Sequence, residues 1–188
     1  EVIETIVYTF DELSRAAREA ARDWYRQLGA HHGWWQSVYE DFTMICNCLG
    51  IAPKTRSVNL HGGGTMTEPC IWFSGFCNLG DGACFEGTWR YRRGGNLAIR
   101  AHAPQDEALH EIADRLQEGQ QRNFYQPVAD IGHEGRYCHE YAMVSTAERD
   151  KKHSQPPTDD AEDAVTFAMR DLARWLYLQR KAEYEHIT

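Results

Sequence analysis

The hydrophobic residues of this 188-residue chain change their spacing twice, and this change constrains the fold more than any other feature. They recur at helical spacing up to residue 49, alternate as in strands from residue 55 to about 102, and return to helical spacing after Pro104. Helical and strand segments that are grouped in this way predict an α+β fold. We expect about four helices packed on an antiparallel sheet of about five strands, in a single domain over residues 1–188.

Four helical segments follow from apolar stripes. The first comes after a short strand at 2–8, begins at the capping-box residues Thr9 and Glu12 and ends at Gly29. We expect it to pack antiparallel to the second helix. The four stripes are Leu13, Ala16, Ala17, Ala20, Ala21, Trp24 and Leu28; Trp35, Val38, Phe42, Ile45 and Leu49; Leu109, Ile112, Ala113 and Leu116; and Ala161, Val165, Ala168, Leu172 and Trp175.

Strand-like segments occupy the centre of the chain. They are "RSVNL" (56–60), "EPCIWFSGF" (68–76), "ACFEGTWRYR" (83–92) and "NLAIRA" (96–101). Glycine-rich turns separate them, which predicts an antiparallel meander, and a later hairpin is predicted over 126–146. The strand at 70–76 carries bulky residues on both faces, so we expect helices to cover both.

Composition and charge exclude several classes of protein. The chain is 42% hydrophobic, enough for a core without disulfides or metals. It has no apolar stretch that could span a bilayer and no export signal, so we expect a cytoplasmic protein with reduced cysteines and no membrane contact. Its cysteines and histidines lack the paired spacing of zinc ligands, so no metal or other cofactor is predicted. The formal charge of −8 disfavours direct nucleic-acid binding and favours a basic partner.

The segment "FSGFCNLGDGACFEGTW" (73–89) carries the strongest suggestion of catalysis. Four of its residues resemble the segment around the nucleophile of ovarian-tumour-type cysteine proteases: Asp81, Gly82, Cys84 and Phe85. The resemblance implies a thiol nucleophile, which needs a lowered pKa and a histidine that acts as general base.

Two interpretations of this segment stay open. As an enzyme, the protein would be a cysteine- or metal-dependent hydrolase that uses Cys84 with a base such as His139, or Asp81 and Glu86 with a histidine on a metal ion. As a structural element, residues 80–82 would form a turn that needs positive φ, and Cys84 would be a buried apolar residue. The strand period after Cys84 and the nearby Glu86 carboxylate, which would raise the thiol pKa, favour the structural interpretation.

Displayed polar and aromatic residues are the candidates for a binding surface. Glycines would present the first of them at the tip of a rigid sheet. Adjacent tryptophans diverge by about 100° on a helix, which exposes one of the two or a neighbouring tyrosine. An acidic helix face could meet a basic surface on a partner. The candidates are Gly80, Asp81, Gly82, Trp34, Tyr39, Asp106, Glu107, Glu111 and Asp114.

Several motifs together resemble one group of proteins. "TFDELS", "GWWQSVYED", "FSGF", "GDGACFEG" and the Trp- and Tyr-rich last helix are similar to small proteins of bacteriophages, prophages and plasmids that carry the label "antitoxin of a toxin–antitoxin stability system". The resemblance implies a non-enzymatic neutraliser in the cytoplasm of a bacterial host cell.

We therefore expect an interaction protein that binds and inhibits a bacterial protein. Its target would be a toxin or a component of an antiphage defence system such as a CRISPR effector. The alternatives are the hydrolase described above and a nucleic-acid-binding protein that uses the arginines of "RYRRGG", which are Arg90, Arg92 and Arg93. The sequence leaves the oligomeric state open.

Overall fold

The computed structural model describes residues 8–31, 35–59, 62–76, 78, 80–149 and 157–187, and in them it confirms the α+β fold. The α-helices are α1 (Arg15–His31), α2 (Gln36–Leu49), α3 (Gly95–His102), α4 (Glu107–Arg122) and α5 (Asp159–Ile187). The strands are β1 (Ile51–Pro53), β2 (Thr55–Asn59), β3 (Thr65–Pro69), β4 (Ile71–Phe73), β5 (Ala83–Phe85), β6 (Gly87–Arg90), β7 (Pro127–His133) and β8 (Met143–Arg149). Two short 3-10 helices are η1 (Phe10–Glu12) and η2 (Glu140–Ala142). Among the described helices, none is both long and apolar enough to cross a bilayer.

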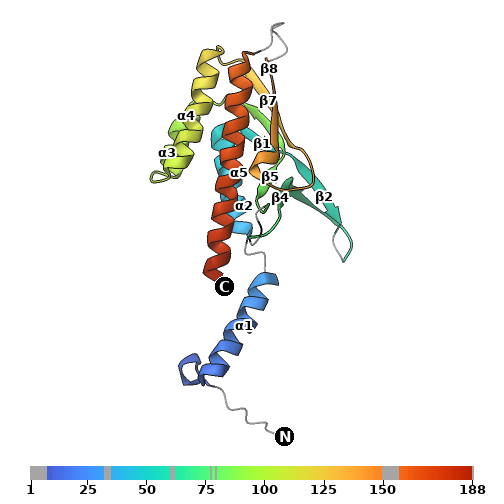
Figure 1. The fold of residues 1–188 in the computed structure, drawn as a ribbon, viewed down its shortest axis with the longest axis vertical. Helices are drawn as coiled ribbons and strands as arrows, with labels where there is room; N and C mark the ends of the chain where they lie inside the picture. Colours follow the sequence, from blue (N-terminus) through green and yellow to red (C-terminus); the bar gives the residue numbers. More distant parts are fainter. Residues whose placement is uncertain are drawn as a thin grey trace.

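The central sheet has four strands in the order β1–β6–β7–β8, each antiparallel to its neighbours (Figure 1). β2 pairs with β3, and β4 with β5, in two further antiparallel ladders. The predicted meander therefore forms, and the predicted hairpin is β7 and β8. The described residues contain eight short strands instead of about five, because the chain changes ladder at Lys54, Cys70 and Glu86.

Three backbone hydrogen bonds join these ladders in a ring. The N–H of Lys54 donates to the carbonyl of Glu86 (2.8 Å), that of Glu86 to Cys70 (2.9 Å), and that of Cys70 to Lys54 (2.7 Å). We call these residues the three-ladder junction. Backbones approach closely beside it, since a Cβ added to Gly87 would lie 2.7 Å from the carbonyl oxygen of Ala52. The junction therefore needs a residue without a side chain at position 87.

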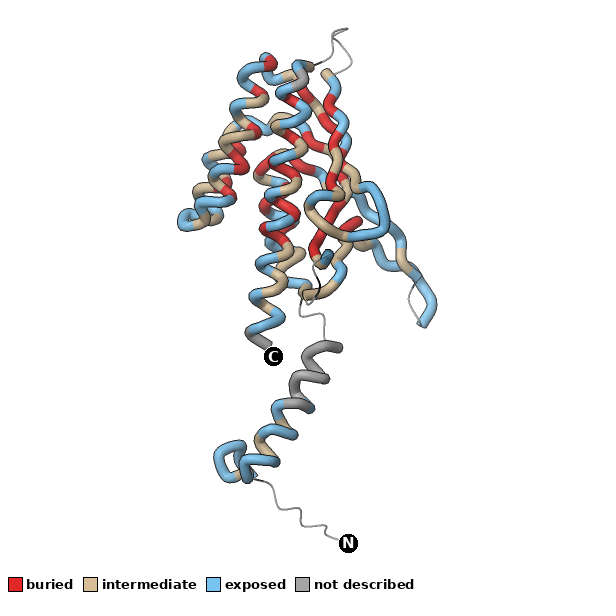
Figure 2. The backbone as a smooth tube through the Cα atoms, in the orientation of Figure 1, coloured by how far each residue is buried: buried red, intermediate tan, exposed pale blue. Residues whose placement is uncertain are grey.

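The core lies between the central sheet and the helices α2, α4 and α5 (Figure 2). The rings of Phe42 and Phe85 meet edge to face, with their centroids 5.2 Å apart. Trp89 is 2% exposed, and its Nε1 donates to the carbonyl of Leu49 (3.1 Å). Helix and sheet are thus joined by buried aromatic packing in which the one polar ring atom has its partner.

Helix α5 runs along the edge strand β8 and occupies its outward-facing backbone groups. The N–H of Ala147 donates to the carboxylate of Glu162 (3.0 Å), and Nε of Arg170 donates to the carbonyl of Met143 (3.2 Å). An open strand edge is a template for pairing with another chain. Side chains of α5 occupy part of this edge.

Helices do not cover both faces of β4, contrary to the prediction. Phe73 faces α5, where its ring lies 6.0 Å from that of Tyr177. On the other face, the ring of Trp72 lies 4.7 Å from the His133 ring and 5.8 Å from the Arg56 guanidinium. Polar side chains of neighbouring strands cover this tryptophan because its ring offers them a π face.

Residues 96–101, predicted as a strand, lie in helix α3. This helix starts after Gly94, whose φ of 76° turns the chain sharply away from β6. The segment is short, and a short apolar run does not distinguish a strand from a helix. Gly95 and Ile99 are buried whereas Leu97 is 69% exposed, so α3 is anchored on a single face.

Helix α1 does not pack against α2 as predicted. The capping box forms, with the N–H of Thr9 donating to Glu12 (2.8 Å), but it encloses η1, and α1 begins at Arg15. Figure 1 shows α1 extending away from the body, and Trp24 is 63% exposed. A stripe made largely of alanine buries little apolar surface and so gains little by packing. Residues 2–7 of the strand predicted at 2–8, and Trp34, lie outside the described residues, and Tyr8 is not in a strand.

Candidate functional site

The loop between β4 and β5 is closed by an aspartate. The carboxylate of Asp81 accepts from the N–H of Asn78 (2.7 Å), and the N–H of Asp81 donates to the carbonyl of Asn78 (3.0 Å). Positive φ occurs at Gly75 (118°), not at Gly80 or Gly82 as predicted. The aspartate thus shapes its own loop, while the special backbone conformation lies at the loop entrance.

Close approach explains the glycine at position 82. The N–H of Gly82 donates to Oγ of Ser74 (3.0 Å), and this hydroxyl donates in turn to the carbonyl of Cys138 (3.1 Å). A Cβ on Gly82 would lie 2.9 Å from that carbonyl oxygen and 2.9 Å from the Cα of His139. The loop is therefore tied to residues that come more than fifty positions later in the chain.

Cys84 is fully buried in β5, opposite Trp72. Burial raises the pKa of its thiol well above the usual range, and the neighbouring Cys138 and the carboxylate of Glu86 raise it further. A cysteine nucleophile needs the opposite, an accessible sulfur with a lowered pKa. The surroundings of Cys84 therefore favour the protonated thiol, which packs as a small apolar group.

The other candidate catalytic residues point to different partners. Nδ1 of His139 accepts from the N–H of Tyr141 (3.3 Å) and lies 3.1 Å from the carboxylate of Glu140. Glu86 lies 3.4 Å from the Lys54 ammonium. Within the described residues, no three His, Cys, Asp or Glu side chains are placed to hold a metal ion. The structure does not bring Asp81, Glu86 and His139 together as one catalytic group.

Two exposed tyrosines stand beside the closed loop. Tyr137 is 72% exposed, and its ring edge lies 3.9 Å from the position of a Cβ on Gly80. Tyr141 is 74% exposed and stacks on His139, with 5.1 Å between the ring centroids. We call Gly80, Asp81, Tyr137 and Tyr141 the loop–tyrosine surface. Neither tyrosine was predicted from the sequence. The one signal available was their position on either side of "CHE" in "RYCHEY".

Tyr39, one of the candidates for an exposed binding surface, belongs to a half-buried cluster around Arg180. The guanidinium lies 3.9 Å from the ring centroid of Phe73, 5.2 Å from that of Tyr39 and 5.6 Å from that of Trp35, and it donates to the Tyr39 hydroxyl. Burial lowers the pKa of Arg180 and raises that of Tyr39. The cluster joins α2, the last residue of β4 and α5, three segments that carry the sequence resemblance, and it lies where the β4–β5 loop begins.

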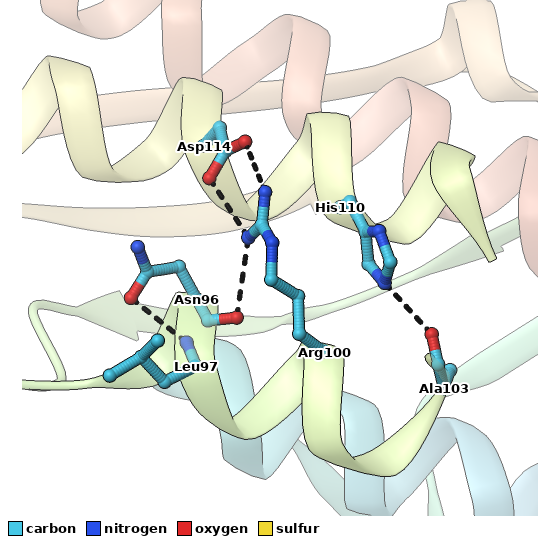
Figure 3. Close-up of polar contacts among 6 residues, drawn as sticks. All are labelled: Asn96, Leu97, Arg100, Ala103, His110 and Asp114. Carbon is cyan, nitrogen blue, oxygen red and sulfur yellow. Dashed lines mark hydrogen bonds and ion pairs between the residues drawn. The ribbon is translucent and has the colours of Figure 1, made fainter. Parts of the chain in front are cut away.

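Two of the four acidic residues predicted for the binding surface make contacts within the protein. Asp106 caps α4 by accepting from the N–H of Leu109 (3.0 Å), and it also accepts from Nε1 of Trp175 (2.7 Å). Asp114 forms a bidentate pair with Arg100 of α3, at 2.6 and 3.1 Å (Figure 3). The remaining two predicted residues, Glu107 and Glu111, are exposed on α4.

Comparison with known proteins assigns a family. The chain matches no curated protein and no solved structure. A family model described as "Domain of unknown function (DUF8835)" matches residues 34–188, which include every described element except η1 and α1. The chain therefore belongs to the DUF8835 family.

Proposed function

We propose that this protein is a non-enzymatic binding protein that inhibits a bacterial protein by occlusion, as an antitoxin or as an inhibitor of an antiphage defence system such as CRISPR. One observation carries the proposal. The reactive groups of the loop hold its structure, whereas the adjacent Tyr137 and Tyr141 are 72% and 74% exposed. The surface therefore offers contact area and not an activated nucleophile.

Tyrosines suit such a surface. Tyr is enriched among residues that dominate binding energy, because it contributes a large ring and a hydroxyl while losing little conformational entropy. The backbone beneath is fixed by Ser74, which bonds both Gly82 and Cys138. A fixed surface pays less ordering entropy on binding.

Charge supports a basic target. The chain has a net charge of −8, and Glu107 and Glu111 remain exposed on α4. Complementary charge accelerates encounter with a basic surface such as that of a nucleic-acid-binding effector. The acidic face would guide the approach, and the loop–tyrosine surface would make the contact.

The test combines target capture with an inhibition assay. The tagged protein is incubated with a bacterial lysate, the retained protein is identified, and its activity is measured with added inhibitor. We expect the double variant Tyr137→Ala, Tyr141→Ala to lose capture and inhibition by at least tenfold. Leu97→Ala, which removes a side chain 69% exposed on α3, serves as the matched control and should change neither.

Two results would refute the proposal. If the double tyrosine variant captures and inhibits the target as well as the unchanged protein, another surface makes the contact. If Cys84→Ala abolishes inhibition while folding and capture persist, the protein acts chemically and not by occlusion.

A further inference from the structure

A strained turn between α4 and β7 displays two aromatic residues. Phe124 has φ of 56° and Tyr125 has φ of 60°, the two non-glycine residues with positive φ in the described part of the chain. Bulky side chains rarely adopt this conformation, and two in succession store backbone strain.

Buried polar contacts impose this conformation. Asn123 is 1% exposed, its Nδ2 donates to the carbonyl of Gly119 (3.1 Å), and its Oδ1 accepts from the N–H and hydroxyl of Thr158 (3.3 and 3.2 Å). The N–H of Tyr125 donates to the carbonyl of Gln120 (2.8 Å). The turn is thus locked to α4 and to the start of α5. Backbone strain that buried contacts hold in place indicates a function for the side chains that the turn exposes.

The turn presents its rings to solvent. Phe124 is 76% exposed, a larger fraction than for any other large hydrophobic residue described, and Tyr125 is 45% exposed. The ring of Tyr125 lies 4.5 Å from that of Tyr91, at the end of β6. Two aromatic side chains from distant parts of the sequence therefore meet at one end of the sheet, and the exposed Phe124 precedes one of them in the same turn.

Arginines occur on the segments that come together at this end of the sheet. Arg90 ends β6 opposite Val128, Arg93 is exposed after it, and Arg122 ends α4 with 70% of its side chain exposed. Arg149 ends β8 opposite Pro127. Three acids lie among them: Glu118 at 3.6 Å from Arg122, Glu148 opposite Val128, and Asp130 opposite Thr88. Arg92 is engaged by the carbonyl and side-chain oxygens of Asn47 and does not contribute. A cluster with more arginines than acids stands out in a chain of net charge −8. We define the α4–β7 patch as Arg90, Tyr91, Arg93, Arg122, Phe124, Tyr125 and Arg149.

We infer that the α4–β7 patch binds single-stranded nucleic acid, with unpaired bases stacked on Phe124 and Tyr125 and phosphates on the arginines. Exposed aromatic rings give sequence-tolerant stacking, and guanidinium groups match phosphate geometry. In a duplex the base faces are stacked on one another and are not available to the rings. A duplex also carries more negative charge per unit length than a single strand, so a protein of negative net charge binds it less favourably. This activity is separate from the proposed inhibition and uses different residues.

Fluorescence anisotropy with a labelled oligothymidylate and the full chain tests the inference. Binding should weaken roughly 20- to 50-fold when salt rises from about 50 to about 200 mM, as follows for three or four phosphate contacts on a single strand. Phe124→Gly should weaken binding about 5- to 150-fold, the value of one stacked base. Because glycine tolerates positive φ, the same variant should unfold at a higher temperature. A purely structural phenylalanine would not combine higher stability with lost binding.

Matched controls separate this activity from the proposed inhibition. Arg93→Gln should weaken binding, whereas Arg136→Gln, an exposed arginine in the β7–η2 loop, should not. Tyr137→Ala should bind the oligonucleotide normally. The inference is overturned by an absence of binding at low salt, by unchanged binding of Phe124→Gly, by equal binding of duplex DNA, or by a polyglutamate peptide that binds the patch where the oligonucleotide does not.

Discussion

Replacing Gly82 with alanine tests why the β4–β5 loop requires glycine. The added Cβ would lie 2.9 Å from the carbonyl oxygen of Cys138 and 2.9 Å from the Cα of His139, and neither backbone atom can rotate away. Overpacking of this kind costs about 1–3 kcal/mol. In a protein of this size each kcal/mol lowers Tm by about 2–4 °C, so we expect Tm to fall by roughly 2–12 °C.

Gly80→Ala is the matched control, two positions away in the same loop. Its Cβ would come no closer than 3.9 Å to the Tyr137 ring, and φ at Gly80 is outside the left-handed region. Alanine there restricts the unfolded chain, which stabilises by about 0.4–1 kcal/mol at a compatible position. Thermal unfolding followed by circular dichroism compares the two variants. Equal Tm values would refute the close-approach argument. A larger fall in Tm for Gly80→Ala would show that backbone conformation, and not close approach, requires glycine in this loop.

Three further predictions concern stability. Burial raises the pKa of the Cys84 thiol above its usual 9.0, so the stability it contributes is complete below pH 9.0 and declines above it. Urea unfolding across that range should therefore show a weaker alkaline decline for Cys84→Ala, and parallel curves would contradict this. Glu162→Ala leaves the N–H of Ala147 without its acceptor, which should lower the free energy of unfolding by about 1–3 kcal/mol. The exposed strand edge should then form oligomers that size-exclusion chromatography detects. Glu162→Gln keeps an acceptor and should elute like the unchanged protein. Trp24→Ala should shift Tm less than Trp175→Phe, because Trp24 is 63% exposed whereas Trp175 donates to a carboxylate at 2.7 Å; the opposite order in calorimetry would show that α1 packs on the body.

Apolar stripes made of large side chains correctly predicted helices that pack in the core. The stripes from Trp35 to Leu49 and from Ala161 to Trp175 correspond to α2 and α5, since periodic Phe, Ile, Leu and Val residues must find a core. The stripe from Leu13 to Leu28 has the same period but is mostly alanine, and only its helical form was predicted correctly. Period therefore gives the conformation, while side-chain volume decides whether a helix is buried.

For the loop at Asp81, the sequence predicted the hydrogen bonding within the loop but not the residues that pack against it. Its carboxylate closes the turn as expected, because that contact spans few residues. The neighbours that require Gly82 to lack a side chain come from the hairpin after β7, and no local pattern indicates that they lie there. Tyr137 and Tyr141 were missed for the same reason.

The three-ladder junction also bears on the order in which the chain folds. Lys54, Cys70 and Glu86 follow one another at equal intervals, so two bonds of the ring close loops of equal length and the bond between Lys54 and Glu86 closes a loop twice as long. Each of the three residues donates to one member of the ring and accepts from the other, so we expect the segment from β1 to β6 to fold as one unit. We expect substitutions at Gly87 to slow folding, and substitutions in the exposed β2–β3 hairpin mainly to speed unfolding. The distant strands β7 and β8 and the helix α5 would then dock onto a nucleus already assembled within one continuous stretch of sequence.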